Sequence, residues 1–140
     1  MHKAKFALMN KMQTMDKAVI NTTDAPAPIG PYNQAILAGN MLFISGQICL
    51  DATSGQLKNK DLQEETHQVM NNLRCILQKA GMTFDHIVKT TIFLTDMNRF
   101  SEVNEIYGKY FKENFPARET VQVSALPKFV NVEISMIAVK

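Results

Sequence analysis

The sequence predicts a single α+β domain in which two helices cover one face of a mixed β-sheet. Two segments repeat apolar residues at helical spacing, and the remaining apolar runs are short enough for strands, in the order β-β-β-α-β-α-β-β. A chain of 140 residues with 46% hydrophobic residues can bury one core. We expect residues 1–16 to form a flexible extension and residues 17–140 to form the domain.

Three short strands are expected before the first helix, at residues 17–21, 34–38 and 41–48. Three prolines in residues 25–31 exclude regular structure between the first two strands. Gly39-Asn40 favours a hairpin turn between the second and third. The third strand begins with apolar residues on both of its faces.

The first helix is expected from Asp61 to Gly81. Asp61 and Glu64 form a variant of the capping box, and Gly81 is a typical residue just past a helix C-terminus. A strand at residues 86–95 should follow. Its expected faces are Val88, Ile92 and Leu94 on one side and Lys89, Thr91, Phe93 and Thr95 on the other.

A second helix is expected at residues 99–113, ending before Pro116, with two final strands at residues 120–126 and 131–140. Its apolar stripe contains Phe100, Val103, Tyr107 and Phe111. Two helices can cover one face of the sheet but not both, and several strands are apolar on each face. We therefore expect a second copy of the chain to cover the other face; the alternative is that loops cover it.

The charge distribution argues against nucleic acid as a partner. The formal net charge of +2 divides into +3 for residues 1–22 and −1 for residues 23–140. A domain so close to neutral lacks the basic surface that phosphate backbones attract. The apolar runs are also far shorter than a membrane-spanning helix requires, so we expect a soluble protein.

Neither a metal site nor a disulfide framework is indicated. The three histidines are scattered, and Cys49 and Cys75 form no CxxC pair, so a reducing compartment is the simpler interpretation. The first 15 residues carry no secretory signal and lack the arginines and serines typical of a transit peptide. We expect a cytoplasmic protein, with mitochondrial import as the lesser alternative.

Arg118 and Glu133 are candidate site residues on the last two strands. Arg118 leads a polar strand face, where a fixed guanidinium can bind a planar carboxylate through two parallel hydrogen bonds; the alternative is a surface arginine at a sheet edge. Glu133 lies between apolar neighbours. Its carboxylate is either solvated at an edge or held beside a cavity, where it could position or deprotonate water.

Three other positions carry two readings each. Asn104 falls within the apolar stripe of its helix, where it either caps a neighbouring backbone or orders a pocket. The pair Ser45-Gly46 marks either a bulge or a close approach by a ligand or second backbone. Tyr32 either packs on the core or closes a pocket.

Six motifs taken together closely resemble the RidA (YjgF) family of reactive-intermediate deaminases, over about residues 17–140. They are IGPYNQA, FISGQI, IVKTTIFLTDM, VNEIYGKYF, FPARETVQVSALPK and VEISMIAV. The resemblance implies a chorismate-mutase-like fold and a homotrimer with a pocket at each subunit interface. It also implies cofactor-free hydrolysis of enamines and imines such as 2-aminoacrylate, the products of pyridoxal-phosphate-dependent dehydratases, to 2-oxo acids and ammonia.

The resemblance assigns roles to individual positions. It implies that Arg118 grips the substrate carboxylate and that Glu133 holds or activates the attacking water. The residues implied to line the pocket are Tyr32, Ser45, Gly46 and Asn104. Thr120 stands where many members have cysteine, so a thiol mechanism is excluded at that position and the substrate preference can differ; hydrolysis needs no such nucleophile.

Two other functions remain open at this stage. An endoribonuclease or translation inhibitor is a label also attached to this family, although the near-neutral domain and the lack of a paired histidine acid and base argue against RNA cleavage. A noncatalytic module that binds 2-oxo acids is the second, and Thr120 is compatible with it.

Overall fold

The computed structural model describes residues 16–140, so all of the expected extension except Asp16 lies outside the described residues. The strands are β1 (Lys17–Ile20), β2 (Ala35–Ala38), β3 (Met41–Gln47), β4 (Ile87–Leu94), β5 (Ala117–Gln122) and β6 (Val132–Val139). The α-helices are α2 (Leu62–Lys79) and α3 (Phe100–Gly108), with 3₁₀ turns at Phe84–His86, Met97–Arg99 and Pro127–Phe129. The predicted order of strands and α-helices is confirmed.

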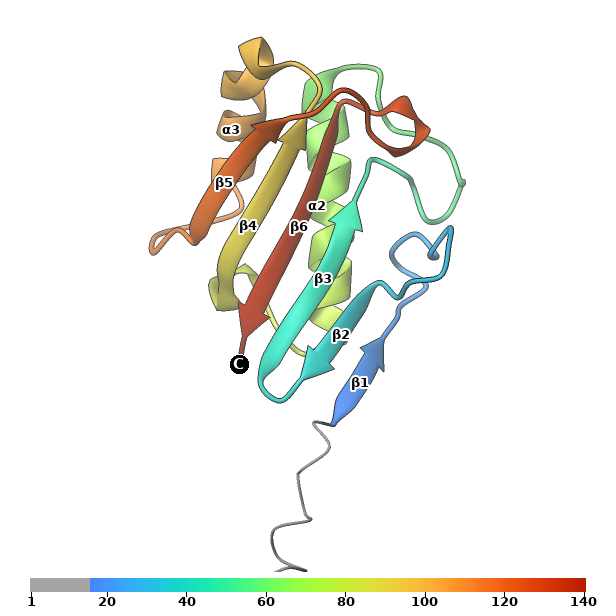
Figure 1. The fold of residues 1–140 in the computed structure, drawn as a ribbon, viewed down its shortest axis with the longest axis vertical. Coiled ribbons are helices and arrows are strands. Elements are labelled where there is room, and N and C mark those ends of the chain that lie inside the picture. The colour runs from blue at the N-terminus through green and yellow to red at the C-terminus, as the bar shows by residue number, and fades with distance from the viewer. Residues whose placement is uncertain (1–15) are drawn as a thin grey trace, which may run out of the picture.

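The strands form one mixed six-stranded sheet in the order β1-β2-β3-β6-β4-β5. The last strand, β6, inserts between β3 and β4; β4 and β5 run parallel, and the other four pairs of these strands are antiparallel. Both helices lie on the same face of the sheet, as Figure 1 shows. The predicted arrangement of two helices on one face is therefore confirmed.

The predicted cap at Asp61 is present in modified form. Its side chain accepts a hydrogen bond from the Glu64 backbone N–H at 2.7 Å. The Glu64 carboxylate, however, accepts from the backbone N–H of Lys60 at 2.9 Å rather than from that of Asp61. Both carboxylates therefore satisfy N–H groups at the start of α2, where the helix itself offers no acceptor.

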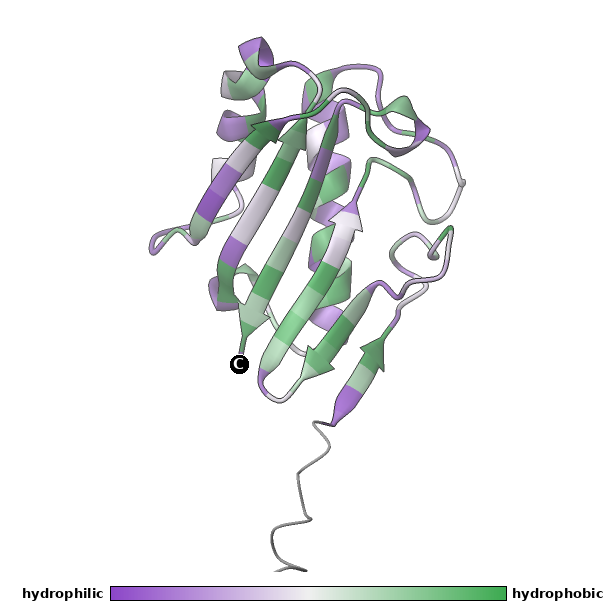
Figure 2. Cartoon of the chain, in the orientation of Figure 1, coloured by the Kyte–Doolittle hydropathy of each residue, from purple (hydrophilic) through white to green (hydrophobic). Residues whose placement is uncertain are grey.

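The alternation of β6 separates the two faces of the sheet. Val132, Ile134, Met136 and Ala138 are buried beneath the helices, whereas the residues between them are half-buried on the face without helices. We call this second surface the open face. Phe43 and Val121 also lie on it, opposite Ile137 and Phe93, and are 42% and 43% exposed. Figure 2 shows that these strands are rich in hydrophobic residues. The exposed Phe43 and Val121 confirm that apolar side chains also lie on the second face.

One expected face is wrong. Val88 is 46% exposed instead of buried, and Ile87 is buried in its place. The pairing of β4 with β6 shifts register between Ile87 and Lys89, and a bulge of this kind reverses the alternation before it. The remaining alternation of β4 is as predicted.

Two expected boundaries also differ. The helix α3 ends at Gly108, although residues 109–111 continue in a tightened turn with bonds to the residue three positions earlier. β5 covers residues 117–122 instead of 120–126, because its parallel pairing with β4 begins at Ala117 opposite Lys89. No helix in residues 16–140 is long and apolar enough to cross a membrane.

Candidate functional site

The residues expected at the site fall into two separate groups in the chain. Arg118 and Asn104 line a groove at the β5 edge of the sheet, on the side of the helices. The other group, Tyr32, Ser45, Gly46 and Glu133, lines a cavity of about 430 Å³. We call these the arginine groove and the glutamate cavity.

Strand register places the two key side chains on opposite faces of the sheet. Arg118 pairs with the buried Thr90 and so points to the side of the helices. Glu133 pairs with Phe93, three positions further along β4, and so points to the open face. One subunit alone does not present both groups to the same small molecule.

The glutamate cavity forms where β3 breaks its pairing with β6. The register shifts between Ile44 and Gln47, which makes Ser45-Gly46 a bulge. What approaches Gly46 closely is neither a ligand nor a second backbone but the side chain of Glu133, because a Cβ atom on Gly46 would lie within 2.8 Å of Glu133 Cδ. The Ser45 hydroxyl donates to the Asn33 carbonyl oxygen at 2.6 Å and joins this bulge to the loop before β2.

The half-buried carboxyl group of Glu133 lies beside the glutamate cavity. Because β6 is an interior strand, its side chain is not solvated at a sheet edge; the cavity interpretation is the one confirmed. Burial raises the pKa of Glu133 above its ordinary value of 4.5. A carboxyl group with a raised pKa can both accept and return a proton nearer to neutral pH.

Tyr32 lines the cavity and is not part of the buried core. It is 45% exposed, and its hydroxyl accepts a hydrogen bond from the Ile29 backbone N–H at 3.3 Å. The rest of the wall is mainly apolar and consists of Pro26, Ala27, Ile29, Ile48, Leu50 and Pro127, with Gln34 and Gln47.

Gln34 holds part of this wall and was not identified from the sequence. It is 2% exposed, and its side-chain oxygen accepts from the Thr22 N–H at 2.7 Å. Its nitrogen lies within 3.1 Å of the carbonyl oxygens of Thr22, Ala25 and Pro26. An amide directly before an apolar strand was the available signal, because a buried amide must find partners.

The arginine groove fixes the guanidinium of Arg118 on three side chains of α3. Its Nη1 donates to Asn104 Oδ1 at 2.8 Å. Its central carbon lies 5.3 Å from the ring centroid of Phe100 and 5.0 Å from that of Tyr107. The other lining residues are Gly108, Phe115 and Pro116.

Asn104 and Thr120 are the two other residues of this region that the sequence singled out. Asn104 is exposed and does not face the core; Val103, Ile106 and Tyr107 are the buried residues of α3, and Asn104 lies at the margin of their stripe. Thr120 shares the face of Arg118 in β5 and is half-buried, but it does not line the groove.

Arg118 retains donors for an external anion. Within residues 16–140 no carboxylate pairs with it, and its neighbour Glu119 is bound to Lys89 at 2.8 Å on the other face of β5. Asn104 occupies one N–H group, which leaves the others for a planar acid. The geometry therefore suits carboxylate binding.

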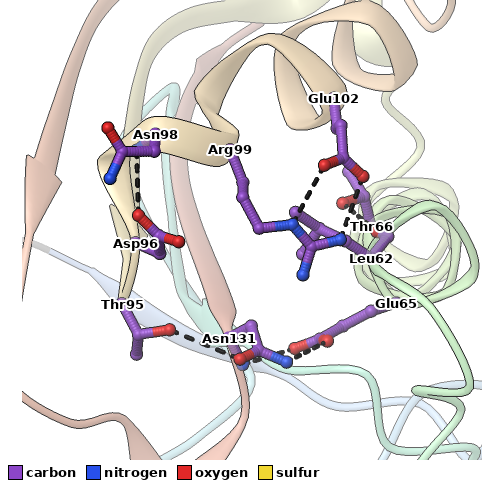
Figure 3. A network of polar contacts seen from close by, with 9 residues as sticks. All are labelled: Leu62, Glu65, Thr66, Thr95, Asp96, Asn98, Arg99, Glu102 and Asn131. Atoms are coloured by element: carbon purple, nitrogen blue, oxygen red, sulfur yellow. Dashed lines mark hydrogen bonds and ion pairs between the residues drawn. The ribbon is translucent and has the colours of Figure 1, made fainter.

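A buried carboxylate on α2, Glu65, fixes the start of β6 (Figure 3). It accepts hydrogen bonds from the backbone N–H groups of Asn131 at 2.6 Å and Val132 at 3.1 Å, and from the Asn131 side chain at 2.9 Å. Glu133 follows directly in the chain. Glu65 is three residues after Leu62 and four before Val69, so its place in the apolar stripe was a signal that sequence reasoning missed.

The described part of the chain contains no group of three or more His, Cys, Asp or Glu side chains that could hold a metal ion. Cys49 and Cys75 are both free. Burial raises the pKa of the Cys49 thiol to about 12, which keeps it protonated and a poor nucleophile.

Residues 22–140 match the model of the protein family described as Endoribonuclease L-PSP. A human protein named 2-iminobutanoate/2-iminopropanoate deaminase is 48% identical over 129 residues, which cover 92% of this chain and 94% of that protein. A RutC family protein of Pyrococcus horikoshii is 50% identical over 124 residues, covering 89% of this chain and 98% of that protein.

Solved structures give the same picture. A Yersinia pestis protein of the Rid family superimposes with a TM-score of 0.87 at 51% identity, covering 89% of this chain and all of that one. Escherichia coli TdcF, solved with bound serine, superimposes with a TM-score of 0.84 at 39% identity, covering 88% of this chain and 98% of that one.

Proposed function

Since the chain belongs to the Endoribonuclease L-PSP family, which includes the RidA and YjgF proteins, we propose that it is a 2-iminobutanoate/2-iminopropanoate deaminase. It hydrolyses the carbon–nitrogen bond of small enamines and imines to give 2-oxo acids and ammonia. Human, mouse and bovine proteins with this name are 46–50% identical over most of the chain. The single observation that carries the residue roles is the guanidinium of Arg118, which no carboxylate of residues 16–140 pairs with and which is set in a groove beside an amide and two aromatic rings.

The active unit in this proposal is a homotrimer. The arginine groove and the glutamate cavity lie on opposite faces of one sheet, and the open face exposes apolar side chains such as Phe43 and Val121. A second copy that covers the open face would bring its own arginine groove to the glutamate cavity. Each complete site then combines Arg118 of one subunit with Glu133 of the next.

The reaction follows from the two groups. The enamine tautomerises to the imine, and Arg118 binds its carboxylate through parallel N–H donors. A water hydrogen-bonded to Glu133 adds to the imine carbon and gives up a proton to the carboxylate of Glu133. That proton then moves to the nitrogen and gives a carbinolamine. Glu133 next takes the hydroxyl proton and returns it to the amino group, so that the carbon–nitrogen bond breaks, the carbonyl bond of the 2-oxo acid forms and ammonia leaves. Positioning and proton transfer are the two sources of rate, the second worth on the order of 10²-fold or more.

The surroundings fit short aliphatic substrates. The apolar wall of the glutamate cavity suits a methyl or ethyl side chain, as found in the imines that dehydratases dependent on pyridoxal phosphate release. Thr120 supplies no thiol, and the hydrolysis needs neither a thiol nor a cofactor. We assign the reaction to the cytoplasm, where the two free cysteines stay reduced.

A dehydratase-coupled assay tests the proposal. With threonine or serine dehydratase as the source of the imine, the protein should speed the release of 2-oxo acid, and Arg118→Ala should abolish that gain without altering the assembly. The matched control is Arg99→Ala, since Arg99 is exposed, pairs with Glu102, and lines neither the arginine groove nor the glutamate cavity. An unchanged rate in Arg118→Ala would remove this residue from the mechanism.

The family description also names an endoribonuclease, and RNA cleavage is the alternative to be tested. Purified protein that cuts RNA, keeps the activity through size exclusion and retains it in Arg118→Ala would support that alternative. Binding of 2-oxo acids without any gain in the coupled assay would instead support a noncatalytic binding module.

A further inference from the structure

We infer that Phe100 and Tyr107 are positioning residues that fix the plane of the Arg118 guanidinium for carboxylate binding; this inference rests on the function proposed above. The two rings and Asn104 form what we call the α3 clamp. Each member contacts the guanidinium directly, at distances that are typical of cation–π contacts and of a hydrogen bond.

The spacing of the clamp follows from helix geometry. Phe100, Asn104 and Tyr107 are separated by four and three residues, so their side chains follow one another along a single face of α3. Arg118 of β5 lies against that face, since it contacts all three side chains. The guanidinium therefore meets one ring, an amide oxygen and a second ring in succession.

Tyr107 is itself fixed to the sheet. It is buried, and its hydroxyl donates to Thr90 Oγ1 at 3.0 Å. Burial raises the pKa of the phenol, which therefore stays protonated and keeps this bond at neutral pH. Arg118 thus packs against a ring that is held in place by α3 and by a hydrogen bond to Thr90 of β4.

The clamp matters because an arginine side chain has many rotamers. A free arginine must lose that freedom when it binds a carboxylate in the two-bond geometry, and the loss weakens binding. A guanidinium that the two rings and Asn104 already hold has lost most of this rotamer freedom before the substrate binds. The clamp should therefore act on substrate binding and affect the bond-breaking step less.

The chain provides a matched control. Arg74 lies 5.9 Å from the ring centroid of Phe84 and 5.1 Å from that of Tyr110, in a clamp of the same kind. This second clamp lines neither the arginine groove nor the glutamate cavity. Phe84 and Phe100 are both partly buried against the core. Phe84→Leu and Phe100→Leu therefore make the same chemical change at similar burial, beside two different arginines.

The experiment measures kcat, KM and the Kd for 2-oxobutanoate in the assembled enzyme, together with the ¹⁵N NMR signal of the Arg118 Nε–H group. Phe100→Leu should raise KM and Kd by about threefold to tenfold with a smaller change in kcat. It should also increase the mobility of the Arg118 signal. Phe84→Leu should change none of these, and Tyr107→Phe, which keeps the ring, should bind more tightly than Tyr107→Leu.

Equal KM and Kd values for Phe100→Leu and Phe84→Leu, with equally ordered Arg118 signals, would overturn the inference. If Tyr107→Leu does not fold, the comparison of Phe100→Leu with Phe84→Leu decides alone. The coupled assay on Arg118→Ala separates the two levels of the argument. Loss of activity there with no effect of Phe100→Leu rejects only the clamp, and full activity there removes Arg118 from the mechanism. No gain with the unaltered protein rejects the proposed function, and the NMR signal still reports on the clamp.

Discussion

The carboxylate of Glu133 lies over the backbone of Gly46, in space that any side chain at position 46 would fill. A Cβ atom there would lie 2.8 Å from Glu133 Cδ and 3.0 Å from its Cγ, closer than packed carbon atoms approach each other. The bulge in β3 brings this glycine beneath the glutamate. The absence of a side chain at Gly46 therefore allows the carboxylate its position at the cavity.

Gly46→Ala should consequently displace the Glu133 carboxylate and slow the coupled reaction. We expect a loss of roughly tenfold to a hundredfold in kcat, because proton transfer by a misplaced carboxylate becomes inefficient. The double variant Gly46→Ala with Glu133→Gln is the control. If Gly46 acts through Glu133, the double variant is no slower than Glu133→Gln, whereas additive losses would show a separate role for the glycine.

The raised pKa of Glu133 predicts the acid limb of the rate profile. Only the ionised carboxylate can take a proton from water. The pKa of Glu133 lies above its ordinary value of 4.5, and kcat/KM should fall as the pH drops through this raised pKa. Measurement of kcat/KM between about pH 4 and pH 8 tests this. Glu133→Gln should be slow and should lack that limb; an identical limb in the variant would assign it to another group.

The same shift predicts how stability depends on pH. Because the folded-state pKa is raised, the folded protein binds this proton more tightly than the unfolded chain does. The associated stability is complete below the unfolded pKa and is lost as the pH rises through the folded one. Glu133→Gln should therefore have the Tm of the unaltered protein at low pH and a higher Tm at neutral pH. A Tm of Glu133→Gln below that of the unaltered protein at neutral pH would mean that other groups of the folded protein stabilise the charged carboxylate of Glu133.

Much of the fold was predictable because its signals are local. Apolar spacing, the acidic cap of α2 and the turn at Gly39-Asn40 depend only on neighbours in the chain. Arg118 could be placed on the polar face of its strand for the same reason. The register shift that exposes Val88 could not be predicted, since a bulge depends on the partner strand.

The arrangement of the site was less predictable, because it depends on contacts between distant segments. The separation of Arg118 from Glu133 follows from the pairing of β5 and β6 with opposite edges of β4, which no local pattern encodes. Asn104 was wrongly expected to face the core, because the margin and the centre of a helical stripe share the same spacing. Buried Gln34 and Glu65 were missed although each lies beside apolar residues.

Gln34→Glu should destabilise the wall of the glutamate cavity. The change replaces an amide nitrogen by an oxygen that faces the carbonyl oxygens of Thr22, Ala25 and Pro26. Leaving the buried Ala25 carbonyl without a donor costs on the order of 1–3 kcal/mol where no water replaces it, and the part-buried carbonyls of Thr22 and Pro26 lose less. Urea unfolding measures the effect, and Gln63→Glu, the same change on the exposed first turn of α2, should be nearly neutral. Equal urea midpoints for Gln34→Glu and Gln63→Glu would show that the hydrogen bonds of Gln34 do not stabilise the protein.

Phe43→Asp should separate the proposed assembly into subunits that remain folded. Phe43 is 42% exposed on the open face, so a charge there meets water in the free subunit but apolar side chains in the assembly. Light scattering should report a smaller mass, with unchanged far-ultraviolet circular dichroism and loss of activity. Asn71→Asp adds the same charge on exposed α2 and should leave the mass unchanged. A full-size, active Phe43→Asp protein would place the interface elsewhere.

Mixing two inactive variants tests whether one site uses two subunits. Arg118→Ala subunits retain Glu133, and Glu133→Gln subunits retain Arg118. In a cyclic assembly that is unfolded and refolded as an equal mixture, a site is intact only when an unaltered arginine meets an unaltered glutamate, so activity should recover to about a quarter of the unaltered level. The same variants combined without exchange should stay inactive. If the two residues act within one subunit, no mixture recovers activity, because every chain lacks one of them.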